Sequence, residues 1–331
     1  MFKKGNLSKR ILTSIFFVCI TLCGFAQKPD TLITKLDSLH KKNDSTGSKQ
    51  VNNTDPSAFN ENTVIKFGDY FVLLGSDMKQ AFTAPFHLKK RDWGNLAKFA
   101  AAEVALSFAD KPIQRNALDL RNNNKGVRDV SDYVTRFGGT YEIYTLVALG
   151  SYGFIFKDQK LKTTTLLATQ AYLTGGAVES VVKFLSGRQR PYYYDPNAAG
   201  PEPRFRGPFY KGTDAAGNKI NSSFPSGHTT VAFAAATVFA MEYRNKPLIP
   251  IISYSVATLI GLSRITENKH WVTDILAGAA LGFLTGQQVV NNYHRYAKIR
   301  NAEAKKKQNT LTFNLNYAFG TVMPGLVYKI N

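Results

Sequence analysis

The sequence contains very little cysteine, and this excludes two classes of protein. Of its 331 residues only two are cysteines, Cys19 and Cys23, and both lie within the first 26 residues. A chain that lost this segment would contain no cysteine, so neither a disulfide scaffold nor a cysteine metal site is expected. With 44% hydrophobic residues the chain is still long and apolar enough to bury a sizeable core, which excludes disorder throughout.

Acidic residues are also scarce, because 23 Asp and Glu stand against 42 Lys and Arg, giving a net charge of +19. An excess of this size is typical of proteins that bind nucleic acid or an anionic membrane surface. Composition alone leaves both kinds of partner open.

The first 26 residues favour the membrane surface over nucleic acid. They begin with four basic residues, continue as an apolar run of about 15 residues from Ile11, and end in the small residues Gly24 and Ala26. This plan predicts a signal peptide (1–26) cleaved before Gln27, with lipidation of Cys23 or a retained anchor as alternatives. Removal lowers the net charge to +15. We therefore expect an exported, periplasm-facing protein that meets phosphate-rich lipids and an anionic membrane surface, and no nucleic acid.

Long hydrophobic runs are missing as well. The longest uninterrupted ones span about 13 to 16 residues, whereas a helix that crosses a bilayer needs about 20. Such lengths fit both a buried helix of a soluble bundle and a short membrane span. The sequence leaves that choice open, with a slight preference for insertion, and it does not indicate an oligomeric state.

Helical periodicity dominates the middle of the chain. After a polar tether (27–60), apolar residues recur at helical spacing over residues 92–109, 131–156, 162–185, 229–244, 248–262 and 270–293. Several of these stretches are rich in alanine, which indicates close helix packing. The prediction is a mainly α fold, a bundle of about six core helices in a domain of residues 61–300.

The last part of the chain, residues 301–331, has a different pattern. A basic run ends near Lys307, and apolar residues then alternate with polar or small ones from Leu311 to Phe319 and again from Leu326 to Ile330. A turn is expected at Met323-Pro324-Gly325. Alternation of period two on both sides of a turn predicts a C-terminal β-hairpin.

Three clusters of polar residues, spread over residues 183–274, point to phosphate chemistry. The first, in KFLSGRQRP, holds Lys183 and Arg190, an ammonium and a planar guanidinium that together suit a tetrahedral oxyanion. The second, PSGH, places Ser226, Gly227 and His228 just before a helix, where main-chain N–H groups can bind phosphate.

The third cluster, in SRITENKHWVTD, supplies Arg264, His270 and Asp274. Residues four apart stack on one helix face, so the Asp274 carboxylate is expected to accept the Nδ1 proton of His270 and leave Nε2 as a nucleophile. With three cations nearby, no metal or other cofactor is required to neutralise a phosphoryl group. The remaining histidines, including His87 and His294, lack such neighbours and are expected at the surface or at an interface.

At these residues the sequence resembles the type 2 phosphatidic acid phosphatase family, whose superfamily also holds the class A acid phosphatases and the vanadium haloperoxidases. The resemblance implies that His270 attacks phosphorus and Asp274 orients it, while His228 protonates the leaving oxygen and later activates water. It assigns the phosphoryl oxygens to a binding set of Lys183, Arg190, Ser226, Gly227 and Arg264.

The resulting hypothesis is a metal-independent phosphatase of the bacterial envelope that hydrolyses a phosphomonoester or pyrophosphate, most simply of a lipid. Three alternatives stay open: a soluble periplasmic nonspecific acid phosphatase, a vanadium-dependent haloperoxidase, and a non-catalytic anion-binding envelope protein. The sequence does not identify the phosphate substrate.

Overall fold

The computed structural model of the protein describes residues 62–193, 205–210, 212–213, 217, 220–306, 310–318 and 321–329. The expected signal peptide and polar tether lie outside these residues. The described part is mainly helical, as predicted. In chain order its α-helices are α3 (Phe67–Thr83), α4 (Lys90–Ser107), α5 (Asp110–Asn123), α6 (Lys125–Val134), α7 (Thr140–Ile155), α8 (Gln159–Ser186), α9 (Gly227–Glu242), α10 (Leu248–Thr266) and α11 (Val272–Lys306).

The single helix predicted over residues 131–156 is in fact two helices, α6 and α7, separated by Gly138 and Gly139. A Cβ atom at Gly138 would lie 2.8 Å from the Cβ of His228 and 2.5 Å from Ile260. The chain therefore breaks where it passes against α9 and α10, and the absence of a side chain permits this close approach.

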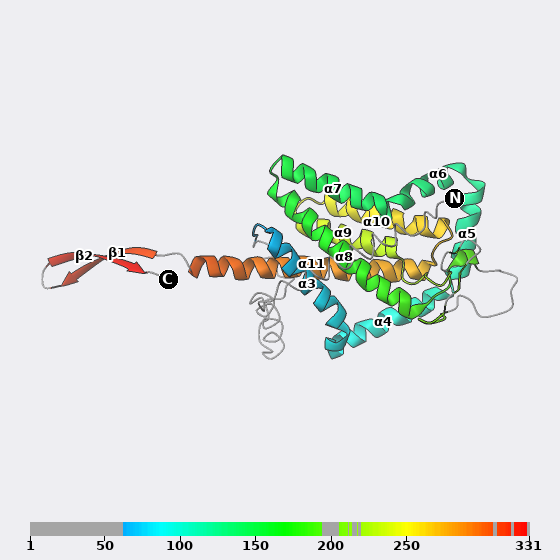
Figure 1. The fold of residues 1–331 in the computed structure, drawn as a ribbon, viewed down its shortest axis with the longest axis horizontal. Coiled ribbons are helices and arrows are strands. Elements are labelled where there is room, and N and C mark those ends of the chain that lie inside the picture. Colours follow the sequence, from blue (N-terminus) through cyan, green and yellow to red (C-terminus); the bar gives the residue numbers. More distant parts are fainter. Residues whose placement is uncertain are drawn as a thin grey trace, which may run out of the picture. The chain divides into compact units, whose positions relative to one another are not determined.

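Helix α9 is the centre of the bundle, and it packs against α8, α10 and α11 (Figure 1). Its side chains are mostly alanine and threonine, and Ala234, Thr230 and Val238 are completely buried. A helix that is apolar or small on every side is suited to a position between three neighbours. The core expected from the alanine-rich pattern is thus built around α9.

Glycines on one face of α11 bring that helix very close to α9. Gly278, Gly282 and Gly286 are spaced by four, so they lie on the same face. An added Cβ would lie 2.7 Å from the Ser226 oxygen at Gly278 and 2.6 Å from the Ala234 oxygen at Gly286. Main chain thus packs directly on main chain along this seam.

The C-terminal hairpin is present, but its turn is not where the sequence predicted it. Strands β1 (Thr310–Ala318) and β2 (Thr321–Lys329) pair antiparallel, and Pro324 lies within β2 opposite Leu315. The prediction of a turn at Met323-Pro324-Gly325 is therefore wrong. A proline fits inside this strand because each strand of a two-stranded sheet has a free edge.

Several helices expose apolar faces. On α10, the side chains that point outward are between 45% and 68% exposed: Leu248, Ile251, Ile252, Val256, Leu259 and Leu262. Among the described residues, α10 is the helix long and apolar enough to cross a membrane by length and composition. Ile143, Val147, Phe154 and Ile155 on α7 are likewise exposed. Continuous apolar surface of this kind marks a face that meets a membrane or a partner.

The glycine seam gives a first prediction. Gly282→Ala places a methyl group against the main-chain oxygen of Thr230, and separating the two helices should cost about 1–3 kcal/mol of unfolding free energy. Thermal unfolding of the purified protein in detergent measures the loss. Gly94→Ala on α4 is the matched control, because its methyl group meets nothing within 4 Å. An equal melting temperature for Gly282→Ala and wild type would contradict the seam.

Candidate functional site

The three polar clusters meet at one end of the bundle. The end of α8 carries Lys183, the start of α9 carries His228, the end of α10 carries Arg264, and the start of α11 carries Asp274. The Ser226 N–H group donates to the main-chain oxygen of Asp274 at 2.9 Å, which ties the second cluster to the third. The structure thus brings together residues that are up to 91 positions apart in the sequence.

His270 lies in a tight loop between α10 and α11 rather than on a helix face, so the predicted helical stacking on Asp274 is wrong. The main-chain oxygen of Arg264 accepts hydrogen bonds from the N–H groups of Lys269 at 3.0 Å and His270 at 3.2 Å. Asn268 completes the reversal with a φ of 56°. This loop folds back on the end of α10 and places His270 beside Arg264.

The Nδ1 atom of His270 faces a main-chain oxygen as well as the expected carboxylate. The Ser223 oxygen lies 2.7 Å from Nδ1, and Oδ2 of Asp274 lies 3.5 Å from it. Both are acceptors, so they favour the tautomer in which Nδ1 carries the proton and Nε2 carries the lone pair. The predicted role of Asp274 is therefore shared with Ser223.

Asp274 is completely buried and firmly held. Its Oδ2 atom accepts hydrogen bonds from the Ser223 hydroxyl at 2.5 Å and the Trp271 N–H at 2.9 Å. Its Oδ1 atom accepts from Arg188 at 2.5 Å. The carboxylate thus connects the histidine loop, the segment before α9 and the segment after α8.

The cations of the site retain capacity to bind an anion. Arg264 is buried, and one of its terminal nitrogens donates to the Thr135 hydroxyl at 2.5 Å. Its Nε atom is buried without a hydrogen-bond partner among the described residues. Nε of Arg190 donates to the Ser222 hydroxyl at 3.1 Å. Hydrogen bonds to neutral hydroxyls leave the positive charge of both arginines available for an oxyanion.

Lys183 is held differently, because it forms an ion pair with Glu179 one turn earlier on α8. The carboxylate of Glu179 also borders the predicted phosphate cradle, since a Cβ added to Gly227 would lie 2.8 Å from Oε1. A phosphoryl group that binds Lys183 therefore competes with this carboxylate.

Helix α9 begins at Gly227, as the PSGH motif predicted, with Ser226 as its N-cap residue. The Ser226 N–H is already bonded to Asp274, so it does not serve the anion as expected. The Ser226 hydroxyl accepts a hydrogen bond from Thr229 at 2.9 Å and keeps its own proton for donation. The Gly227 N–H and the Ser226 hydroxyl are thus the donors that this helix start offers.

Burial and the surrounding cations keep both site histidines neutral. Burial, reinforced by Arg264, lowers the pKa of His228 to about 3. Burial also lowers the pKa of His270 to about 4, although Asp274 opposes the shift. A neutral His270 has the free lone pair that a nucleophile needs. His228 lacks the proton of a general acid as long as no anion offsets the cations.

Sequence reasoning missed Arg188, Asp110 and Ser223. Arg188 lies between the two recognised members of the first cluster, and it pairs with Asp110 at 2.6 Å as well as with Asp274. Its position inside the basic motif KFLSGRQRP could have identified Arg188 as a site residue. Asp110 stands at the start of α5, 73 positions before Lys183, and nothing in its neighbourhood marked it.

A cavity of about 540 Å³ adjoins the site at Lys183. The C-terminal end of α8 and the segment before α9 form its walls. The lining residues include Glu179, Lys183, Phe184, Tyr210, Asn221 and Ser222. Ligand cavities commonly have this size. The cavity offers room for a substrate larger than a phosphate ion.

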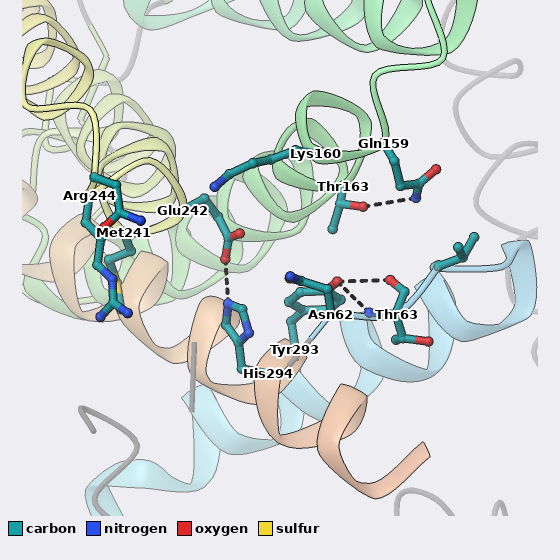
Figure 2. A pocket seen from close by; sticks show the side chains of 12 residues that line it. Asn62, Thr63, Gln159, Lys160, Thr163, Met241, Glu242, Arg244, Tyr293 and His294 are labelled. Atoms are coloured by element: carbon teal, nitrogen blue, oxygen red, sulfur yellow. Dashed lines mark hydrogen bonds and ion pairs between the residues drawn. The ribbon is translucent and has the colours of Figure 1, made fainter. Parts of the chain in front are cut away.

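A second polar cavity, of about 480 Å³, lies at the other end of α8 (Figure 2). Gln159 is one of its lining residues. At a rise of 1.5 Å per residue, Gln159 lies about 36 Å along α8 from Lys183. Glu242 and His294 meet there at 2.7 Å (Figure 2). His294 is buried, so of the two expected positions, surface or interface, the structure excludes the surface. This cavity holds none of the predicted catalytic residues.

Comparison with known proteins finds one family whose matched region contains all three polar clusters. Residues 164–297 match the PAP2 superfamily. The chain is 31% identical over 207 residues to the lipid A 1-phosphatase of Porphyromonas gingivalis. The matched region covers 61% of this chain and 39% of that relative. It is 36% identical over 70 residues to phosphatidylglycerophosphatase B of Bacillus subtilis, covering 19% of this chain and 34% of that protein.

Among solved structures, the chain is similar to a transmembrane PAP2 type phosphatidylglycerolphosphate phosphatase from Bacillus subtilis. The TM-score is 0.41 at 20% identity, and the match covers 64% of this chain and 96% of that structure.

The charge of the site predicts proton uptake with anion binding. Sulfate stays doubly charged near pH 6, so its binding should raise the pKa of His228 and draw a proton from the buffer. Calorimetric titration with sulfate in two buffers of different ionisation enthalpy measures this uptake. His228→Gln should bind sulfate without the uptake. Equal proton uptake in His228→Gln and wild type would contradict the assignment.

Proposed function

We propose that this chain, whose helical core belongs to the PAP2 superfamily, is a phosphatase that uses His270 as its nucleophile. The observation that carries the proposal is the geometry of His270, whose Nδ1 atom faces the Ser223 oxygen at 2.7 Å and Oδ2 of Asp274 at 3.5 Å. In a neutral ring this arrangement leaves the lone pair on Nε2, and burial lowers the pKa of His270 to about 4. A neutral imidazole among cations is suited to attack an anionic phosphoryl group.

In the first step Nε2 of His270 forms a bond to phosphorus, and the bond from phosphorus to the leaving oxygen breaks. Lys183, Arg190 and Arg264 balance the charge of the phosphoryl oxygens, with the Ser226 hydroxyl and the Gly227 N–H as further donors. The bound dianion raises the pKa of His228, which then donates its proton to the leaving oxygen.

In the second step water replaces the leaving group. His228, now neutral, accepts a proton from that water as its oxygen attacks phosphorus, and the bond from phosphorus to His270 breaks. Phosphate leaves and both histidines return to their starting state. Asp274 and the Ser223 oxygen keep the His270 tautomer unchanged through both steps.

A phosphorylated lipid is the substrate class that the site favours. The cavity beside Lys183 is large enough for a headgroup, and Phe184 on its wall is 58% exposed. The similar proteins include a lipid A 1-phosphatase and a phosphatidylglycerophosphatase. This chain spans 39% of the length of the first of them. A lipid phosphomonoester or pyrophosphate is therefore the proposed substrate.

We place the protein at a membrane surface, facing the periplasm after export by residues 1–26. The exposed apolar faces of α7 and α10 would lie in the lipid, and the positive charge of the mature chain would favour an anionic surface. A site at the end of the bundle would then lie at the depth of lipid headgroups.

The central prediction concerns His270. His270→Ala should lower phosphate release by at least about 1000-fold for every substrate, because the nucleophile is lost. Released phosphate is measured with and without detergent from undecaprenyl pyrophosphate, lipid A, phosphatidate and a soluble phosphomonoester. His87→Ala is the control, since His87 is an exposed residue far from the site in sequence.

The same panel separates the alternatives. A preference for the soluble ester would favour a nonspecific acid phosphatase, and halide oxidation that depends on added vanadate would favour a haloperoxidase. Unchanged phosphate release by His270→Ala, or a wild-type protein that binds phosphate without releasing any, would overturn the proposal.

The membrane placement predicts a position-dependent effect of charge. Leu259→Lys on the outward face of α10, where Leu259 is 52% exposed, should raise the share of protein that carbonate extracts from membranes. Lys125→Glu at the start of α6 is the control, because this residue is already charged and exposed. Recovery of the wild-type protein in the carbonate-soluble fraction would contradict insertion.

A further inference from the structure

We infer that Arg188 and Asp110 form a positioning pair that holds Asp274 ionised and correctly oriented toward His270. This inference rests on the proposed function, because it assigns a role in the same reaction. Neither residue belongs to the set that sequence reasoning assigned to the site.

Arg188 lies between two carboxylates in the interior. One of its terminal nitrogens donates to Oδ1 of Asp274 at 2.5 Å, and the other donates to Oδ2 of Asp110 at 2.6 Å. Its side chain is 2% exposed, and both carboxylates are completely buried. Such a fork fixes two carboxylates at a defined distance and angle.

Arg188 is poorly suited to bind phosphate in this arrangement, although its Nε atom has no hydrogen-bond partner among the described residues. Both terminal nitrogens are engaged, and the aromatic rings of Phe205, Phe224 and Trp271 surround the guanidinium at 5.0 to 5.9 Å. Its charge is balanced by two carboxylates, whereas Arg190 and Arg264 bond to neutral hydroxyls. The arginine therefore acts through Asp274.

Asp110 anchors this pair to the start of α11. Its Oδ1 atom accepts the Thr273 N–H at 3.1 Å, and its Oδ2 atom accepts the Thr273 hydroxyl at 2.8 Å. Thr273 also receives a hydrogen bond from Arg188 at 2.6 Å. Asp110 thus fixes both the arginine and the residue next to Asp274.

Oδ1 of Asp274 is occupied by Arg188, so Oδ2 is the atom that faces His270, Ser223 and Trp271. A carboxylate with both oxygens assigned cannot rotate, and an ionised carboxylate can only accept hydrogen bonds. Loss of Arg188 would allow Asp274 to take up a proton. A protonated Asp274 could donate toward His270 and would no longer favour the proton on Nδ1.

Five charged or titratable groups face Asp274 from the surrounding elements: Arg188, His270, Arg190, Asp110 and Glu103. Burial alone would raise the pKa of Asp274, and the charge of Arg188 is the first of the opposing causes that lower it. Burial raises the pKa of Asp110, although Arg188 and Thr273 oppose the shift. Burial also raises the pKa of Glu103 on α4 to about 7, so Glu103 adds little negative charge below neutral pH.

The test compares three variants over a range of pH. Arg188→Met keeps the length and removes the charge, Arg188→Lys keeps the charge and removes the fork, and Asp110→Asn weakens the anchor. Arg188→Met should lower kcat about 10- to 100-fold with KM within about threefold, because substrate binding groups stay intact. The acidic limb of kcat/KM should move upward by at least about one pH unit.

Arg188→Lys should restore the acidic limb but only part of kcat. Asp110→Asn should lower kcat by less than Arg188→Met does and should not move the acidic limb upward, because the charge of Arg188 is then left to Asp274 alone. Arg115→Met on the exposed side of α5 is the matched control. A role confined to stability would lower the yield or melting temperature and leave the acidic limb of the folded fraction in place. That result in Arg188→Met would overturn the inference.

A readout without turnover separates this inference from the proposed function. The ¹⁵N shifts of His270 in labelled protein report which ring nitrogen carries the proton. Arg188→Met should show a weaker preference for Nδ1 near pH 5, because the Ser223 oxygen alone would still favour it, while the wild type and Arg115→Met keep the full preference. A wild type that releases no phosphate yet shows this difference would refute the phosphatase and leave the positioning pair standing. An unchanged tautomer in all variants would refute the pair.

Discussion

The close approach of α9 and α11 is the constraint on which the site depends. Where Gly278 faces the Ser226 oxygen, main chain packs on main chain, so the starts of the two helices lie side by side. Ser226 can then donate to the Asp274 oxygen, and the segment before α9 can place the Ser223 oxygen against His270. Side chains of ordinary size along this seam would separate the proposed phosphate-binding residues from the proposed nucleophile. Helix packing therefore determines the geometry of the chemistry.

The electrostatics of the site follow from an imbalance that an anion corrects. Arg190 and Arg264 bond to neutral hydroxyls, and in the part of the chain that the structure describes no carboxylate forms an ion pair with either. Burying charge without a counter-charge is costly, and the cost falls when a phosphoryl dianion enters. Burial lowers the pKa of His228, and the charges of Arg264 and Arg190 add to the shift. In the proposed reaction, binding and proton supply are therefore coupled, because the substrate would provide the charge that lets His228 hold its proton.

Much of the fold was predictable from the sequence because helical periodicity is a local signal. The centre of the bundle and the start of α9 at PSGH followed from that signal, as did a hairpin at the C-terminus. The break at Gly138 was not predictable, since it reflects contact with His228 and Ile260, which are distant in sequence. The loop position of His270 was missed for a similar reason. The hydrogen bonds to the Arg264 oxygen turn the chain there, and spacing by four suggested a helix instead.

The first basic motif shows why residue type alone does not assign a role. Arg188 and Arg190 are two positions apart and would both be read as phosphate ligands by charge. Their side chains alternate along an extended segment, so one turns to the interior and the other toward the cavity beside Ser222. Arg188 points to the interior and forms ion pairs with Asp110 and Asp274, which neutralise its charge. A neighbouring carboxylate therefore distinguishes a positioning arginine from a phosphate-binding arginine. One of the two carboxylates that pair with Arg188 is Asp110, which lies on α5, a helix without any recognisable motif.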